Sequence, residues 1–421
     1  MFKFIIKGLL KDRSRSLFPI LTISAGVMLT VLMYSWLNGF ATMTIRENAR
    51  FSTGHIKIMT RAYEKMAEQR PLDLALLGTD EIVKNVREKY PEITWLPRIY
   101  FGGLLDLPDE NGETKSQGEI MGMAVDLLSN NKEKDLLNLE KAVIQGRLPG
   151  KQGEILISQE VADKMGIKLQ DDVTVITSTM FGSLSMYNFN VCGTITFGVS
   201  AMDRGAVIID LSDARYMLDM ENGASEILGI MPKYDEEKTY KISVEFNSEF
   251  TDESDQYSSI MKPLREQNNL DFLISSMDER LGTMIFIFVF IMSLVLWNAG
   301  LMNGIRRYGE VGVRLAIGES KGHIYRMMIF ESLMIGVAGT IIGTAIGLIF
   351  SYILQYTGID ISNLMKDAKV LMSTKMQAQV NSTSYVIGLL PGILSSVLGA
   401  VISGIGIYKR NTAQLFKELE T

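Results

Sequence analysis

The sequence contains few of the residues that enzymes commonly use for covalent catalysis and metal binding. Among its 421 residues there is one cysteine, Cys192, and there are two histidines, His55 and His323. A single cysteine cannot form an intrachain disulfide, so cysteine usage does not reveal the compartment. Cys192 lies in an alternating apolar run. Because free cysteines are usually buried, we expect a buried strand thiol there.

Motifs for nucleotide binding and hydrolysis are not evident either. There is no GxxxxGK[ST] phosphate loop, and the GESKG stretch at Gly318–Gly322 does not have its spacing. We identify no HExxH helix and no nucleophile elbow. His55 and His323 are expected on opposite sides of a membrane, where they cannot share a metal ion. The sequence therefore predicts a chain that is not an enzyme, with no metal site and no cofactor of its own.

An excess of basic charge is also lacking. The formal net charge is −6, so the chain as a whole has no attraction for nucleic acid. Hydrophobic residues make up 47% and charged residues 21%, and the mean hydropathy is +0.15. This is too apolar for an ordinary soluble protein and too charged for a pure membrane bundle. The composition indicates a membrane protein with a water-soluble domain.

Four long apolar runs contain no charged residue. A bilayer core needs about 20 helical residues, so each run is long enough to span it. The first run is too long for a signal-peptide core and has no evident cleavage site, so we expect an anchor that stays. The runs are Leu17–Phe40, Thr283–Asn303, Ser332–Gln355 and Tyr385–Tyr408.

Three segments rich in lysine and arginine fall on one side of a four-span chain, which predicts that both termini are cytoplasmic in a multi-pass inner-membrane protein. The basic residues are Lys3, Lys7, Lys11, Arg13 and Arg15 before the first run, Arg306, Arg307, Arg314, Lys321 and Arg326 between the second and third, and Lys409, Arg410 and Lys417 after the fourth. No charged residue lies in a span centre, which argues against an ion-coupled transporter.

These signals predict one order of segments along the chain. They are a cytoplasmic amphipathic helix at 1–16 (or a plain cytoplasmic helix), transmembrane helix 1 at 17–40, an extracytoplasmic domain with a stalk at 41–282, transmembrane helix 2 at 283–303, a cytoplasmic loop at 304–328, transmembrane helix 3 at 329–355, a short outer loop at 356–384, transmembrane helix 4 at 385–408 and a cytoplasmic tail at 409–421.

The outer segment, about 240 residues long, is sufficient for a domain with its own core. It alternates strand and helix patterns, which indicates layered α+β structure with two subdomains. Expected strands are GHIKIM, EITWLPRIYFGGLLDL, GEILI, DDVTVIT and YNFNVCGTITF; NGE at Asn111–Glu113 is an expected hairpin turn. Expected helices are TDEIVKNVREKY, capped by Thr79 or Asp80, QEVADKMG, capped by Ser158 and ending at Gly166, and DLSDARYML.

Small residues recur at four-residue spacing in the third and fourth runs. Such stripes allow close helix packing, so we expect these two helices to pack together rather than to line a substrate path. We expect Pro391 to kink the fourth helix. The stripes are Gly339, Gly343 and Gly347 in the third run, and Gly388, Gly392, Ser396, Ala400 and Gly404 in the fourth.

Two stretches resemble one family. Arg306–Gly347 resembles the signature of the FtsX/MacB/Lol permeases, the mechanotransmission (type VII) class of ABC transporters. The matching positions are Arg307, Glu310, Arg314, Gly318, Phe330, Glu331, Gly336, Gly339 and Gly343. The stretch from Gly146 to Ile176, followed by Phe189–Phe197 and Ala206–Leu218, is similar to the MacB-like periplasmic core domain. Met165-Gly166 stands in place of leucine-glycine and Asp171-Asp172 in place of glycine-aspartate.

The resemblance implies an α-helical membrane protein with four transmembrane helices and a large extracytoplasmic α+β domain inserted between helices 1 and 2. It also implies a coupling helix that docks on a cytoplasmic ABC ATPase dimer, which binds ATP and magnesium. Without the resemblance, the loop would be read as merely basic. The coupling residues are Glu310, Val311, Val313, Arg314, Leu315, Ile317 and Gly318, with Glu310 and Arg314 as the charges that fix register on the ATPase.

The family mechanism implies a dimer with a second permease subunit, identical or different, and a stalk formed by roughly Ala41–Arg50 and Met261–Leu281. The layout is closest to the lipoprotein-releasing LolC/LolE-like permeases, which implies lipoprotein transport and a periplasmic carrier or adaptor. A candidate hook for this partner is Thr177–Tyr187, although an ordinary hairpin fits as well; it lacks the proline usual in that hook. Its expected exposed residues are Met180, Phe181, Leu184 and Met186.

Three other functions stay open. MacB-like efflux of peptides or drugs is the first, and FtsX-like control of cell-wall hydrolases is the second. FtsX proteins have a much smaller outer domain than the one expected from this sequence. The third is a structural or sensory membrane protein without an ATPase. The sequence does not name the substrate.

Overall fold

The computed structural model describes residues 13–129, 132–197, 200–267, 270–305, 308–360 and 375–409. These residues form two compact units. One, the helical unit, contains the described residues within 13–43, 276–359 and 375–409. The other contains those within 44–275 and Asp360, and we call it the outer unit after the segment that the sequence predicts outside the membrane. The expected N-terminal amphipathic helix and most of the C-terminal tail lie outside the described residues.

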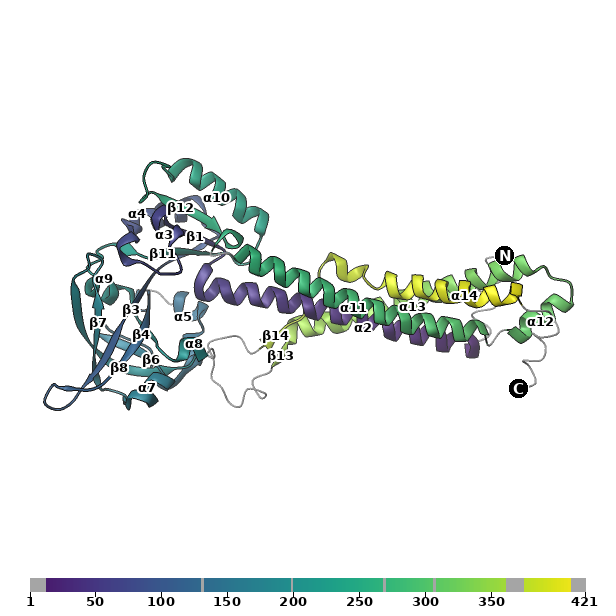
Figure 1. The fold of residues 1–421 in the computed structure, drawn as a ribbon, viewed down its shortest axis with the longest axis horizontal. Helices are drawn as coiled ribbons and strands as arrows, with labels where there is room; N and C mark the ends of the chain where they lie inside the picture. The colour runs from purple at the N-terminus through teal and green to yellow at the C-terminus, as the bar shows by residue number, and fades with distance from the viewer. Residues whose placement is uncertain are drawn as a thin grey trace. The chain divides into compact units, whose positions relative to one another are not determined.

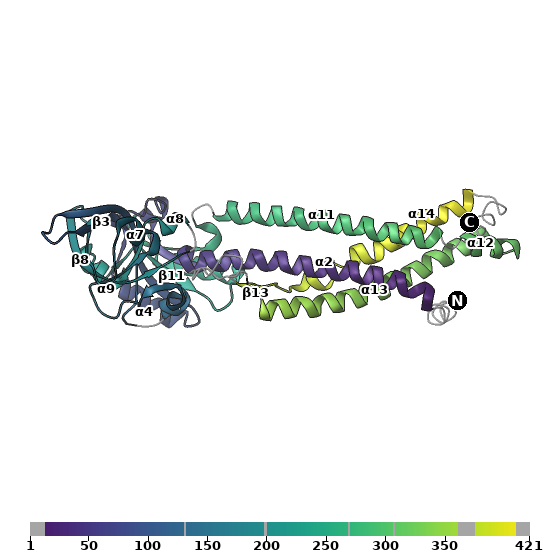
Figure 2. The same cartoon turned by 90° about the horizontal axis from the view of Figure 1, so that it is seen from below.

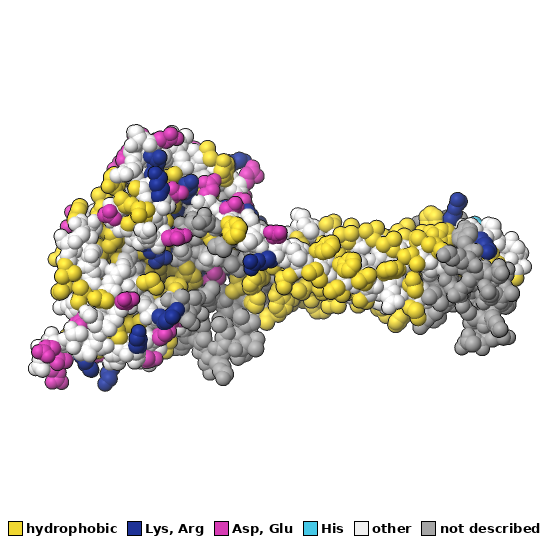
Figure 3. All heavy atoms as spheres, in the orientation of Figure 1, with side chains coloured by type: hydrophobic (Ala, Val, Ile, Leu, Met, Phe, Trp, Pro, Cys, Tyr) yellow, Lys and Arg dark blue, Asp and Glu magenta, His cyan; other side chains and the backbone are white. Residues whose placement is uncertain are grey.

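Long helices dominate the helical unit (Figures 1 and 2). Four of its segments are long and apolar enough to cross a membrane: Leu17–Thr53, Glu279–Asn298, Lys321–Thr357 and Ser382–Ile405. Hydrophobic side chains cover this part of the surface in Figure 3. The elements are α2 (Arg13–Asn48), α11 (Leu270–Ile305), α12 (Tyr308–Ala316), α13 (Lys321–Thr357), β13 (Ile359–Asp360), β14 (Lys375–Met376), the 3-10 turn η5 (Ser382–Tyr385), the π-helical turn η6 (Leu390–Leu394) and α14 (Ser395–Lys409).

The glycine stripe of α13 packs against α2. A Cβ built on Gly343 would lie 2.5 Å from the carbonyl oxygen of Ser24, and one on Gly347 would lie 2.9 Å from Cβ of Val31. The Ser24 hydroxyl donates to the Gly339 carbonyl at 3.1 Å. We expected this stripe to face the fourth span, so its main partner differs from the prediction. A row of small residues marks a face that allows close approach, but it does not specify which helix approaches.

The helix α14 and the turn before it meet α13 on a different face. The Ser332 hydroxyl donates to the Ser396 carbonyl at 2.9 Å, and Cβ atoms on Gly336 and Gly392 would strike Ser396 and Thr340 respectively. The two helices therefore pack together as expected, but around Gly336 rather than Gly339. Pro391, where we expected a kink of the fourth helix, lies in the π-helical turn η6.

The outer unit is built on a mixed sheet with short helices. Its strands are β1 (Ile56–Thr60), β2 (Leu76–Leu77), β3 (Thr94–Pro108), β4 (Thr114–Val125), β5 (Val143–Gly146), β6 (Glu154–Ser158), β7 (Asp172–Ser178), β8 (Leu184–Ile195), β9 (Ala206–Asp210), β10 (Gly223–Ala224), β11 (Glu226–Ile230) and β12 (Ser259–Pro263). Its helices are α3 (Arg61–Lys65), α4 (Thr79–Lys89), α5 (Lys132–Leu136), α6 (Leu139–Ala142), α7 (Gln159–Met165), α8 (Ser200–Asp203), α9 (Leu211–Met217) and α10 (Glu236–Phe250), with single turns η1 (Ala49–Thr53), η2 (Leu72–Leu74) and η3 (Leu264–Glu266).

Six strands pair in a closed ring. The order is β3-β4-β9-β6-β8-β7 and back to β3; β4–β9 and β6–β8 are parallel and the other pairs antiparallel. Alternate residues such as Phe101, Ile155 and Phe189 fill its interior core, to which α7 and α9 also contribute. We expected layers, and a closed barrel is a correction. Strand alternation reveals which residues face inward, but not that the first strand pairs with the last.

A second subdomain extends from the same long strand. Residues 94–98 of β3 pair with β11, which is followed by β1 and β12, and residues 99–108 of β3 pair with β4. The helices α4 and α10 cover this second sheet, where Trp95, Val83 and Phe246 are buried in one cluster. The outer unit therefore has two subdomains, as expected, and β3 runs through both.

Helix capping follows the sequence in one case and departs from it in another. The Ser158 hydroxyl accepts a hydrogen bond from the Val161 amide at 3.0 Å, and α7 ends before Gly166, as expected. The expected caps Thr79 and Asp80 of α4 are wrong. The side-chain oxygen of Asn222 accepts from the Asp80 amide at 2.9 Å, so a residue distant in sequence caps this helix.

The expected stalk also needs correction at its second segment. Met261–Pro263 belong to β12 and pair with β1, and the helix α11 begins only at Leu270. Met261 is fully buried in the core of the second subdomain. The residues around Met261 form a strand because they pair with the edge of β1. The local sequence does not reveal this pairing.

Candidate functional site

The connection between α11 and α13 contains α12, the expected coupling helix. Its end is set by Gly318, which has φ +98°. Backbone hydrogen bonds from Gly318 to Leu315 and from Glu319 to Arg314, both 3.1 Å, close the last turn. A left-handed residue that ends a helix in this way is usually glycine. Gly318 therefore stops α12 and turns the chain toward α13.

One face of α12 is buried against the start of α13. Val311 is almost fully buried and forms a small cluster with Ile324 and Met328, against which Leu315 is half-buried. These residues anchor α12 within the chain itself. Two of the residues expected to dock on a partner, Val311 and Leu315, are thus used inside the molecule.

The opposite face of α12 is exposed. Val313 is 41% exposed and Ile317, just after the helix, is 82% exposed. Glu310 and Ala316 are exposed as well, at spacings that place them on the same face. An apolar patch with one acidic residue beside it is suited to contact with another molecule.

Arg314 forms an internal ion pair. Its guanidinium donates to both carboxylate oxygens of Glu319 at 2.5 and 2.6 Å, and it lies 3.1 Å from the sulfur of Met327. The arginine lowers the pKa of Glu319 below its ordinary value. The pair joins α12 to the connection that follows it. Arg314 thus stabilises α12 and the turn that follows it. We expected Arg314 instead to present a charge to the partner, together with Glu310.

The connection itself spells GxSxG, a pattern that sequence inspection missed. In hydrolases such a serine lies on a turn between a strand and a helix. Ser320 instead lies between two helices, α12 and α13, and its backbone carbonyl accepts from the amides of His323 and Ile324 at 3.0 and 3.2 Å. Ser320 therefore occupies the N-cap position of α13, and not the strand–helix turn on which a hydrolase nucleophile lies.

The expected hook is the hairpin that joins β7 to β8. Phe181, Leu184 and Met186 are 72%, 69% and 62% exposed. Met180 is half-buried against the barrel core, and its amide donates to the Leu218 carbonyl at 2.8 Å. Its assignment as an exposed residue is wrong, because the end of α9 and the residue after it lie against the hairpin, where the Ser185 hydroxyl also donates to the Met217 carbonyl at 2.7 Å. The other three residues form an exposed apolar tip.

The exposed apolar surface continues across the barrel. Met186 lies opposite Ile176 on β7, and Ile176 lies opposite Leu104 on β3. Ile176 and Leu104 are half-buried. We refer to Phe181, Leu184, Met186, Ile176 and Leu104 as the apolar band. Sequence inspection missed Leu104 and Ile176, although both alternate with the buried Leu105 and Val175 and so had to face outward.

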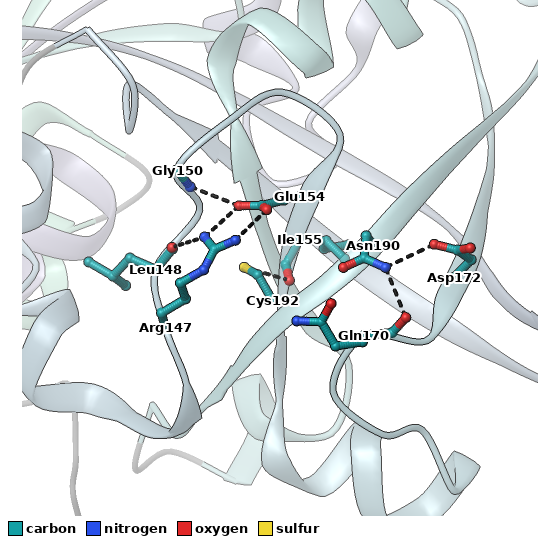
Figure 4. Close-up of polar contacts among 9 residues, drawn as sticks. All are labelled: Arg147, Leu148, Gly150, Glu154, Ile155, Gln170, Asp172, Asn190 and Cys192. Carbon is teal, nitrogen blue, oxygen red and sulfur yellow. Dashed lines mark hydrogen bonds and ion pairs between the residues drawn. The ribbon is translucent and has the colours of Figure 1, made fainter.

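Arg147 and Glu154, which both lie in the stretch that resembles the periplasmic core domain, meet in Figure 4. The Arg147 guanidinium donates to Glu154 at 2.5 and 2.7 Å, and the Gly150 amide donates to the same carboxylate at 2.8 Å. Arg147 lowers the pKa of Glu154 to about 2. Nearby, Asn190 donates to Gln170 and Asp172, both at 2.9 Å. These motifs fix the loop before β6 and contain no free reactive group.

This pair predicts an acid-dependent loss of stability. The Glu154 carboxyl has its pKa lowered in the folded state, so its contribution is complete above the ordinary value of 4.5 and is lost as pH falls towards about 2. Because Arg147 is half-exposed, we expect Glu154→Gln to cost about 1 kcal/mol at neutral pH. Thermal unfolding at several pH values checks this. The wild type and Glu154→Gln should converge at low pH, and a constant difference would contradict the prediction.

Arg98 on β3 forms a fully buried ion pair with α5 and also bonds the backbone at the start of the outer unit. The Arg98 guanidinium donates to both oxygens of Glu133 on α5 at 2.9 Å. It also donates to the carbonyls of Phe51 and Arg50 at 3.0 and 2.9 Å. Arg50 in turn bonds the Leu136 carbonyl and Glu47. The end of α2 and the π-helical turn η1 are therefore fixed to both β3 and α5.

Burial shifts the pKa values of His55 and Cys192, and the surroundings of both are structural. Burial lowers the pKa of His55 to about 4, and its Nδ1 accepts from the Met231 amide at 2.9 Å. Cys192 is buried as expected, and burial raises the pKa of its thiol to about 12. Within the described part of the chain, no three histidine, cysteine, aspartate or glutamate residues are placed to hold a metal ion.

Parts of this chain are similar to known proteins. The model of the family described as FtsX-like permease C-terminal matches residues 282–412. The macrolide export ATP-binding/permease proteins MacB of Neisseria meningitidis serogroup A (strain Z2491) and serogroup B (strain MC58) are each 30% identical to this chain over 118 residues. The match covers 25% of this chain and 18% of either relative, so the chain spans about a fifth of their length.

A solved structure provides a further comparison. The periplasmic region of MacB from Actinobacillus actinomycetemcomitans aligns with 56% of this chain and 98% of its own length, at 12% identity and a TM-score of 0.36.

Proposed function

We propose that this chain, whose residues 282–412 match the FtsX-like permease family and part of which is similar to MacB proteins, is an FtsX/MacB-type membrane subunit of an ABC transporter driven by a separate cytoplasmic ATPase. The exposed face of α12, with Val313 and Ile317, carries this proposal. It is apolar, it is flanked by basic residues that favour the cytoplasmic side, and the Arg314–Glu319 pair holds its shape. Two copies of a permease, or two different ones, would match an ATPase dimer.

The proposed mechanism is transmission of motion rather than passage through the spans. ATP-driven closure of the ATPase would displace α12, and α13 would follow because Val311 packs on Ile324 and Met328. The glycine stripe of α13 packs tightly on α2, so α2 would move with it. The helix α2 is continuous from Arg13 to Asn48, and the Arg98 guanidinium donates hydrogen bonds to backbone carbonyls just beyond its end.

The most direct experiment is purification of the tagged chain in lipid nanodiscs together with its ABC ATPase. A stable complex whose ATP hydrolysis changes on reconstitution supports the proposal. If the chain purifies from its native membrane without any ATP-binding subunit, the structural or sensory function would be favoured instead. Locating both termini by protease protection tests the orientation independently.

For the substrate, we propose lipoprotein release from the inner membrane. The observation behind it is the apolar band, which offers an exposed apolar surface on the outer unit. A soluble carrier of lipid-modified proteins would need such a surface. Efflux of peptides or drugs is the second candidate, because the Neisseria relatives are named as macrolide exporters. Control of a cell-wall hydrolase is a third.

Site-specific crosslinking distinguishes these functions. A photoreactive amino acid in place of Phe181, at the tip of the apolar band, should capture a periplasmic carrier or an acylated protein in intact cells. Tyr240 on α10 is 54% exposed and lies outside the band, so it serves as the matched control position. Capture of an efflux adaptor at Phe181 would favour export of small molecules, and equal capture at both positions would contradict a specific docking surface.

A further inference from the structure

A cavity of about 670 Å³ lies on the outer face of the barrel, over β3, β4 and β9. This size is typical of sites for small organic ligands, which measure about 300–1,000 Å³. Its wall includes Tyr100, Met123 and Phe197, which are all buried, and Met121, which is exposed. Aromatic and methionine side chains make a soft apolar wall that adapts to flexible chains. Glu68 and Arg70 are the charged residues of the lining.

Gly102 keeps this cavity open. It lies in the middle of β3, opposite Met121, where glycine weakens a strand. Its φ does not fall in the left-handed region, and a Cβ built on it would meet no heavy atom of the described chain within 4 Å. Neither backbone conformation nor close packing therefore requires glycine here. A larger side chain at this position would project into the cavity.

Arg70 supplies a positive charge beside the apolar wall. Its guanidinium lies 4.3 Å from the centroid of the Tyr100 ring. Its backbone is left-handed, with φ +50°, a conformation that costs a residue other than glycine about 1–2 kcal/mol. Strain of this kind is often found at ligand-binding positions. Stacked on the ring, the guanidinium keeps its N–H edge available for an anion.

We propose that this cavity binds a single-chain amphiphile with an anionic head, its apolar chain on the methionine and aromatic wall and its head at Arg70. The site is distinct from the α12 face and from the apolar band, and it requires no ATPase. Its occupant is an anion rather than a cation because Arg70 is held over the buried Tyr100 ring. Glu68 and Arg70 are both solvent-exposed, so the ring contact, and not burial, favours Arg70 as the group that binds the head.

Photolabelling of the full chain in nanodiscs tests this site. The probe is palmitic acid that carries a diazirine, compared with the corresponding alcohol and amine, and labelled peptides are identified by mass spectrometry. We expect the acid to label β3 and β4. Gly102→Leu fills the cavity and should reduce labelling by all probes. Arg70→Gln should reduce labelling by the acid about tenfold, because one charge-assisted hydrogen bond is lost. Labelling by the alcohol should not change.

Two controls make the outcome decisive. Lys115→Gln removes an exposed charge at the far end of β4 and should leave labelling unchanged. Ile317→Glu, which addresses the ATPase face, should also leave it unchanged, so failure of the transporter proposal does not affect this one. Unchanged labelling by the acid in Arg70→Gln, or stronger labelling by the amine than by the acid in the wild type, would overturn the proposal. The Arg70 result stands even if Gly102→Leu fails to fold.

Discussion

Replacing Ile317 with glutamate is expected to abolish coupling to the ATPase while the permease remains folded. Ile317 is 82% exposed, so the substitution removes no internal packing. In the proposed complex, however, it would place an unpaired charge in an apolar contact. Central contacts of this kind are worth about 2–4 kcal/mol, which corresponds to an affinity at least about thirtyfold lower. Co-purification with the ATPase and ATP hydrolysis in nanodiscs measure the effect.

Ile317→Leu is the matched control and should retain binding, because it preserves the apolar surface. Val311→Ala is a different control. It lies on the buried face of α12 and should loosen the helix on α13 rather than change the docking surface. Full ATPase binding by Ile317→Glu would show that α12 does not dock through this face. The proposed mechanism would then need another contact with the ATPase.

Replacing Arg98 with methionine is expected to destabilise the outer unit far more than Glu154→Gln does. Arg98 and Glu133 are both fully buried. Without Arg98, the Glu133 carboxylate and the carbonyls of Arg50 and Phe51 lose their buried donor. Breaking a buried pair in this way costs about 3–5 kcal/mol, and the unfolding temperature should fall by about 10 °C. Thermal unfolding of the full chain, followed by hydrogen exchange in β3 and α5, measures it.

The double variant Arg98→Met with Glu133→Met separates charge from packing. It removes both charges of this pair, so neither is left buried without its partner, and it should recover much of the stability lost in the single variant. If the hydrogen bonds of Arg98 just beyond the end of α2 transmit motion, the double variant should not recover coupling between the ATPase and the outer unit. An unaltered unfolding temperature in the single variant would show that water replaces the guanidinium.

Local features of the sequence predicted local structure well. Apolar length identified the four candidate spans because membrane helices need little besides length and hydrophobicity. Ser158 and Gly166 marked the ends of α7, since the capping contacts lie within four residues. The position of α12 followed from the family signature. Gly318 marked the end of the helix in the sequence alone, because glycine readily adopts positive φ.

Features that depend on distant residues were not predictable. Asn222 caps α4 from far along the chain. Glu133 reaches Arg98 from another element, and no pattern distinguishes it from a solvated glutamate. The face of α13 that meets α2 looked the same as one that would meet α14. At the coupling segment, the sequence placed Arg314 on the helix, but Glu319 lies beyond the turn, and only the fold brings the two together.

The single strand β3 has a mechanical consequence for the outer unit. Its residues 94–98 belong to one sheet and its residues 99–108 to the other, and Arg98 lies where they meet. Hydrogen bonds of antiparallel strands run perpendicular to the strand axis. A pull along β3 from the end of α2 therefore shears the ladders of both sheets at once, so many bonds would have to break together. The two subdomains should then shift as one body under load, without a weak seam between them.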